Sequence, residues 1–131
     1  MHKRFLTAGA VFGGLAVALG AFGAHGLEKV TADAKTLHGF QTGVEYQLYH
    51  ALALLAVAIV FEKFPNSLVR WAGNLFIAGI LLFSGSLYLL TFLKIQGSSV
   101  MSIVGPVTPI GGLLIIGGWV CLMAGVLKKG Q

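Results

Sequence analysis

The chain has 131 residues, of which 56% are hydrophobic and only 10% are charged, and its formal net charge is +5. This composition excludes a disordered chain, and so few charges cannot coat a water-soluble domain of this size. The basic residues are spread along the sequence and form no stripe, which disfavours a nucleic-acid-binding protein. We therefore expect an all-α integral membrane protein.

Four windows of the sequence are apolar and long enough, at about 20 residues, to cross the hydrocarbon core of a bilayer. They predict a four-helix transmembrane bundle that forms a single domain over residues 1–131. The first window follows Lys3 and Arg4, as in a signal peptide, but its length favours a retained helix. The predicted spans cover residues 5–24, 44–61, 71–93 and 108–127.

A short amphipathic segment precedes the second span. Apolar residues recur there at steps of three and four, so they would form one apolar stripe along a helix. The stripe consists of Leu37, Phe40, Val44 and Leu48. We expect this segment to lie in the outer interface and to run into the second span, with a polar loop over Thr31–Thr36 as the alternative.

The distribution of lysine and arginine predicts the orientation. With four spans, both termini and the second connection share one side, which carries Lys3, Arg4, Lys63, Arg70, Lys128 and Lys129. The other side carries Lys29, Lys35 and Lys94. Because positive charge favours the cytoplasmic side, we expect a multi-pass protein of the plasma (inner) membrane with both termini in the cytoplasm.

Most of the 19 glycines lie inside the predicted spans. Small residues let membrane helices approach closely, and Gly111, Gly118 and Gly125 recur at steps of seven along one face. The first span has a similar pair in Gly9 and Gly13. Packing within one bundle is the favoured interpretation of this glycine-rich pattern, and a seam between copies in a homo-oligomer is the alternative.

Polar side chains gather in the outer halves of the predicted spans. They form a candidate ligand-binding cluster of His25, Glu45, Tyr46, Gln47, His50, Ser84, Ser86, Tyr88 and Thr108. Gln47 and His50 lie one turn apart, away from the apolar stripe, and should point into the bundle. Hydrogen bonds between helices are the first interpretation of the cluster. A small pocket that opens outward for a lipid headgroup, a quinone ring or a metal is the second.

The sequence does not indicate an enzyme site, because it shows no nucleophile–base or acid–base pair. The single cysteine, Cys121, excludes an intrachain disulfide and paired-thiol redox chemistry. The histidines lack a tight metal-binding spacing. A haem between His25 and His50 remains geometrically possible, so the cofactor stays unknown.

Three functions from different classes therefore stay open. The leading one is a non-enzymatic module that binds a lipid-like ligand or a membrane partner at the polar cluster. A small oligomeric transporter or channel is the second, although Glu45, the only carboxylate inside a predicted span, lies at the interface. A haem- or quinone-binding redox subunit is the third.

Four sequence blocks are distinctive together. They occupy residues 20–27 (GAFGAHGL), 40–52 (FQTGVEYQLYHAL), 82–88 (LFSGSLY) and 108–112 (TPIGG), with Trp119 downstream. In this order they resemble the family of small four-span bacterial inner-membrane proteins of unknown function that includes YwdK and YgdD. The resemblance covers nearly the whole chain. It implies four membrane helices and no particular activity.

Overall fold

The computed structural model describes residues 2–97 and 101–128, and within them it contains helices and no strand. The long helices are α1 (Lys3–His25), α2 (Ala34–Lys63) and α6 (Val107–Leu127). The third span is one continuous helix made of α3 (Ser67–Gly79), the π-helical turn η2 (Ile80–Ser84) and α4 (Gly85–Gln96). Two short elements, η1 (Leu27–Lys29) and α5 (Met101–Val104), lie in the connections.

Four of these helices are long and apolar enough to cross a membrane, which confirms the all-α four-span architecture. The third extends over Ser67–Gln96 and the second over Ala34–Lys63, so both are longer than the predicted spans. The segment before the second span is helical from Ala34 and enters α2 without a break. Its apolar positions Phe40 and Val44 are buried against α1 and the third span, so they pack within the protein.

Side-chain caps define where the helices begin. Asp33 starts α2, because its carboxylate accepts hydrogen bonds from the Lys35 amide at 3.3 Å and the Thr36 hydroxyl at 2.7 Å. The Thr36 hydroxyl also holds the pKa of Asp33 below its usual value. The third span ends with α4, which terminates at Gly97. The φ of Gly97 is +69°, the left-handed conformation that glycine adopts readily.

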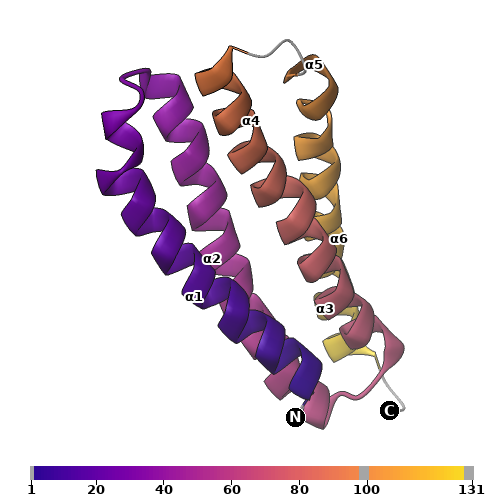
Figure 1. Cartoon of the computed structure of the whole chain (residues 1–131). Coiled ribbons are helices and arrows are strands. Elements are labelled where there is room, and N and C mark those ends of the chain that lie inside the picture. The colour runs from indigo at the N-terminus through magenta and orange to yellow at the C-terminus, as the bar shows by residue number, and fades with distance from the viewer. Residues whose placement is uncertain (1, 98–100, 129–131) are drawn as a thin grey trace.

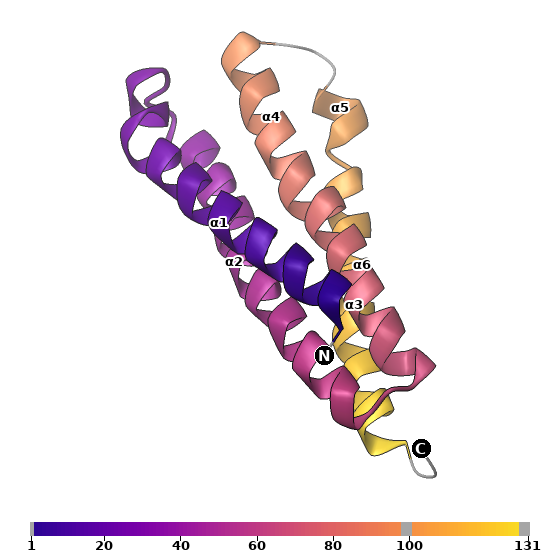
Figure 2. The same ribbon diagram turned by 60° about the horizontal axis from the view of Figure 1, so that its bottom comes forward.

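The bundle consists of two antiparallel helix pairs. α1 packs along α2, and α3 packs along α6, while α2 contacts the third span between them. The start of α1, the end of α6 and the turn between α2 and α3 lie at one end, which we call the proximal end (Figure 1). The two pairs separate toward the opposite, distal end, which carries η1 and α5 (Figure 2).

An apolar core fills the proximal half of the bundle. Phe5, Leu54, Val57 and Phe76 are fully buried there. Because lipid tails are as apolar as these side chains, close van der Waals packing, and not the hydrophobic effect, stabilises this apolar core. A smaller cluster of Leu27, Phe40 and Val44 lies at the distal end.

Glycines of α6 allow a close contact with the third span. A Cβ at Gly111 would lie 2.4 Å from the Phe83 backbone nitrogen in η2, and one at Gly125 would lie 2.6 Å from Val69. Gly118 faces Phe76 in the same way. The seven-residue repeat on α6 is therefore a packing seam within the bundle.

Candidate functional site: polar contacts between the helix pairs

Gln47 joins three helices. Its side-chain amide donates to the Phe12 carbonyl of α1 at 2.8 Å, and its Oε1 accepts from the Tyr88 hydroxyl of α4 at 2.6 Å. The side chain is only 3% exposed. Without water in a bilayer, each polar atom of a buried amide needs a protein partner, and Gln47 has one for each of its two polar atoms.

Ser84 makes a second contact between α2 and the third span. It is the last residue of the π-helical turn, and its hydroxyl donates to the Gly43 carbonyl at 2.7 Å. Gly43 packs against the Tyr88 ring, where an added Cβ would lie 2.9 Å from a ring carbon. Glycine at this position allows the backbone of α2 to come close enough for the bond.

His50 links α2 to α6. Its Nε2 lies 2.9 Å from the Trp119 indole nitrogen, and its Nδ1 lies 2.8 Å from the Tyr46 carbonyl oxygen. An indole N–H only donates and a carbonyl only accepts. The imidazole is therefore neutral, with its proton on Nδ1. The ring also packs against Phe76, with centroids 5.5 Å apart.

Ser86 and Thr108 form a separate contact between α4 and α6. Ser86 donates to the Phe83 carbonyl within its own helix at 2.8 Å. Its oxygen therefore accepts from the Thr108 hydroxyl, which lies within hydrogen-bonding distance. This pair ties the distal start of α6 to the third span.

We call the contacts of Gln47, Tyr88, Ser84, His50 and Trp119 the polar network. Among the described residues, no buried side-chain nitrogen or oxygen lacks a hydrogen-bond partner. The network is thus satisfied within the protein. A polar ligand would have to displace bonds that already exist there.

Three of the predicted cluster residues contribute little to these contacts. His25 is exposed in the last turn of α1. Glu45 is half-buried and accepts from the Gln41 side chain at 3.3 Å, one turn away on the same helix. The Tyr46 ring is 40% exposed and lies 4.9 Å from the Phe83 ring. Tyr46 takes part only through its backbone carbonyl.

Trp119 is absent from the predicted polar cluster, although it is the partner of His50. The sequence argument placed His50 in the outer turns of the second span. Because α2 begins at Ala34, His50 lies near the middle of that helix, level with Trp119 of α6. The available signal was chemical: an indole N–H inside a membrane helix needs an acceptor, and His50 offers one.

The contacts of His50 affect whether it could bind a haem. Both ring nitrogens of His50 are engaged and the side chain is 5% exposed, so axial ligation of a haem would require loss of the Trp119 bond. Within the described part of the chain, no group of three or more His, Cys, Asp or Glu side chains is arranged to hold a metal ion.

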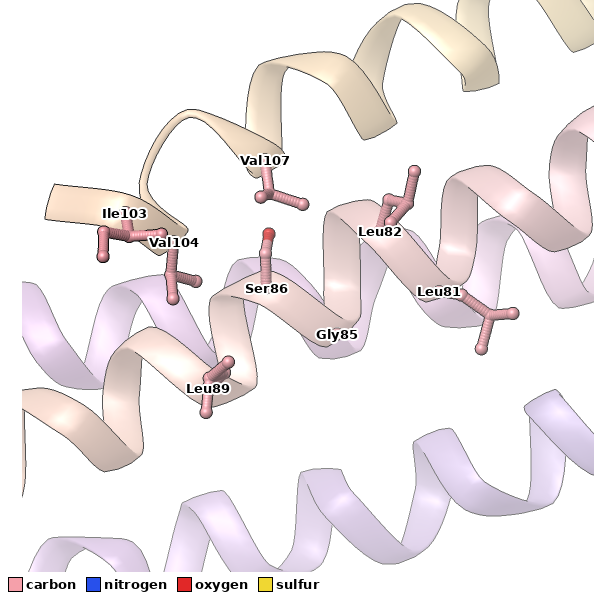
Figure 3. Close-up of a pocket in the computed structure, with 8 residues that line it drawn as sticks. All are labelled: Leu81, Leu82, Gly85, Ser86, Leu89, Ile103, Val104 and Val107. Carbon is pink, nitrogen blue, oxygen red and sulfur yellow. The ribbon is translucent and has the colours of Figure 1, made fainter. Parts of the chain in front are cut away.

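Two apolar grooves flank the polar contacts. The first, which we call the α5 groove, has a volume of about 370 Å³ and runs between the third span and α5–α6. Figure 3 shows the Ser86 side chain directed toward α6 among aliphatic neighbours. The groove is lined by Leu81, Leu82, Gly85, Ser86, Leu89, Ile103, Val104 and Val107.

The second groove, which we call the distal groove, has a volume of about 260 Å³. It lies where the two helix pairs separate, between α1, η1 and α2 on one side and α4 on the other. Its lining consists of Phe22, Leu27, Val30, Phe40, Tyr88, Thr91, Phe92 and Ile95. The Thr91 hydroxyl donates to the Leu87 carbonyl, which leaves the groove apolar.

Comparison with known proteins gives a consistent result along the chain. The UPF0382 membrane protein YwdK of Bacillus subtilis is 46% identical over 127 residues, covering 96% of this chain and 98% of that protein. A UPF0382 membrane protein of Haemophilus influenzae is 42% identical over 129 residues, 98% of each chain.

The similarity extends to a eukaryote. The UPF0382 membrane protein C1782.12c of Schizosaccharomyces pombe is 42% identical over 116 residues, covering 87% of this chain and 93% of that protein. No solved structure matches the chain. A family model described as a protein of unknown function, DUF423, matches residues 19–112. The chain therefore belongs to this family of membrane proteins of unknown function.

Proposed function

We propose that the protein is a non-enzymatic membrane module that holds the apolar chain of a lipid-like molecule in the distal groove. The observation that carries this proposal is the position of Tyr88. Its ring lines the groove, while its hydroxyl donates to Gln47 in the polar network. A molecule in the groove would touch a side chain that holds the two helix pairs together.

The chemistry of the groove favours a hydrocarbon chain. Its walls are aromatic and aliphatic, and its polar side chains, Tyr88 and Thr91, direct their hydroxyl protons to other protein atoms. Its volume of about 260 Å³ is below the roughly 300–1,000 Å³ typical of pockets for drug-sized ligands. The groove therefore suits a segment of a chain, and the bilayer supplies such chains at high concentration.

The predicted orientation indicates which leaflet would supply the lipid. The proximal end carries Lys3, Arg4, Lys63, Arg70 and Lys128. If positive charge marks the cytoplasmic side, both termini are cytoplasmic and the distal groove opens into the outer leaflet. The occupant then comes from the lipids of that leaflet.

Blocking the groove with a larger side chain tests the proposal. Val30 lines the groove and is 60% exposed, whereas Val17 on α1 is 68% exposed and lies outside the groove lining. Val30→Trp and Val17→Trp therefore add the same bulk at a groove position and at an ordinary lipid-facing position. Both variants should keep the wild-type melting temperature within a few degrees.

The readout is native mass spectrometry after delipidation and return of phosphatidylethanolamine. We expect the wild type and Val17→Trp to retain one tightly bound lipid and Val30→Trp to lose it. A photoactivatable phosphatidylethanolamine should crosslink to the lining of the groove in the first two proteins only. Equal lipid retention and crosslinking by the two tryptophan variants would contradict the proposal.

A further inference from the structure

Two arginines from different helices are held in place at the proximal end. Arg4 lies in the first turn of α1, with its guanidinium 5.2 Å from the centre of the Phe5 ring. Arg70 lies in the first turns of α3, with its guanidinium 5.4 Å from the centre of the Phe61 ring. Cation–π contact limits the freedom of both side chains, so their positive charges occupy defined positions.

The groups that contact the two arginines do not neutralise their positive charges. Arg4 donates a hydrogen bond to the side-chain oxygen of Asn74, which is neutral. Within residues 2–97 and 101–128, neither arginine forms an ion pair with a carboxylate. Glu62 is the acidic residue at this end, and it too has an interaction partner. An arginine fork that lacks an acidic partner can still form bidentate hydrogen bonds to an anion.

His2 lies between the two aromatic rings that contact the arginines. Its ring stacks on Phe5 with centroids 3.9 Å apart and meets the edge of Phe61 at 5.0 Å. The pKa of His2 is lowered, first by burial and then by the positive charges of Arg4 and Arg70. Asn74, which accepts the hydrogen bond from Arg4, lies one turn after Arg70 on α3, so the two guanidinium groups are on the same side of that helix.

We propose that Arg4 and Arg70 form a binding site for the phosphate of an anionic phospholipid in the leaflet at the proximal end. The location selects a lipid as the source of the phosphate, because the two guanidinium groups lie at the ends of membrane-spanning helices, where headgroups are found. The aromatic rings beneath the arginines place apolar surface next to the site. This inference does not depend on occupancy of the distal groove.

Native mass spectrometry of the full-length protein in detergent tests the site, with phosphatidylglycerol and phosphatidylcholine titrated separately. The wild type should bind phosphatidylglycerol more tightly than phosphatidylcholine. Because one basic residue near an anionic headgroup changes affinity about fivefold, Arg70→Gln should weaken phosphatidylglycerol binding about fivefold and Arg4→Gln plus Arg70→Gln more strongly. Arg70→Gln alone keeps the Arg4–Asn74 bond, so it decides the test if the double variant does not fold.

A matched control removes the same charge from the distal end. Lys35→Gln plus Lys94→Gln changes two exposed lysines and should leave phosphatidylglycerol binding within a factor of two. Val30→Trp should also keep it, which separates this site from the distal groove. Equal affinity for the two lipids, an equal loss in the lysine control, or displacement of the lipid by millimolar inorganic phosphate would overturn the proposal.

Discussion

The contact between His50 and Trp119 shows how a membrane protein accommodates buried polar side chains. The imidazole is 5% exposed, and a charged or unpaired nitrogen at that depth would be costly. The Tyr46 carbonyl and the Trp119 indole satisfy one ring nitrogen each. The residue is thereby neutral and fixed in one tautomer, and it joins the first helix pair to α6.

A double-mutant cycle measures the strength of this contact. Trp119→Phe keeps the aromatic packing against Phe76 but leaves the His50 Nε2 without a donor, so it should destabilise the protein. Combined with His50→Phe, the coupling free energy should be about 0.6 kcal/mol and at most about 1.7 kcal/mol, the range found between membrane helices. The measurement is reversible unfolding in mixed micelles.

One outcome of the double-mutant cycle would contradict this expectation. A coupling energy of zero would mean that the two rings only pack together and that the hydrogen bond contributes nothing. The ¹⁵N chemical shifts of His50 provide a second check, because they distinguish the expected Nδ1–H form from the Nε2–H form. The conservative variant Trp71→Phe, at an exposed tryptophan, serves as the control.

At this scale the sequence predicted positions better than partners. Gln47 and His50 share a helix face, and both are buried, at 3% and 5% exposure. Their partners were not predictable by the same argument, because Trp119 and Tyr88 lie on other helices whose tilt and rotation set which atoms meet. His25 and Glu45 have the right residue types, but neither joins the contacts between the helices.

The seam between α6 and the third span is the main feature at the level of the elements. The seven-residue repeat of Gly111, Gly118 and Gly125 predicted a smooth face, and that face packs against α3 and η2. The π-helical turn over Ile80–Ser84 had no signal in the sequence, since the stretch reads as ordinary apolar helix. The turn coincides with the close approach of Gly111 to the backbone of Phe83, a contact between helices that a single stretch of sequence does not show.

Gly111→Ala tests the seam. The added Cβ would lie 2.4 Å from a backbone nitrogen, which cannot move aside like a flexible side chain. We expect a loss of about 1–3 kcal/mol in unfolding free energy, typical of an overpacked core. Gly14→Ala is the matched control, because its Cβ would meet nothing within 4 Å, and it should be neutral or slightly stabilising. Equal effects of the two substitutions would rule out close packing at Gly111.

The whole molecule is two helix pairs that touch closely at the proximal end and separate at the distal end (Figure 2). Apolar packing dominates the first region, and the polar network bridges the pairs farther along. Composition and uncharged windows were sufficient to predict four spans. The separation of the pairs, and with it the distal groove, was not predictable, because it depends on the angle at which the pairs pack.

Cysteine accessibility measures the arrangement of the whole chain directly. In a Cys121→Ser background, single cysteines replace Ala32 in the distal connection, Pro65 in the proximal turn and Lys128 after α6, all exposed. With a membrane-impermeant maleimide on intact cells, we expect Ala32→Cys to react and the other two to react only after permeabilisation. Reaction of Pro65→Cys and Lys128→Cys from opposite faces of the membrane would contradict the four-span bundle, and with it the polar network and both proposed lipid sites.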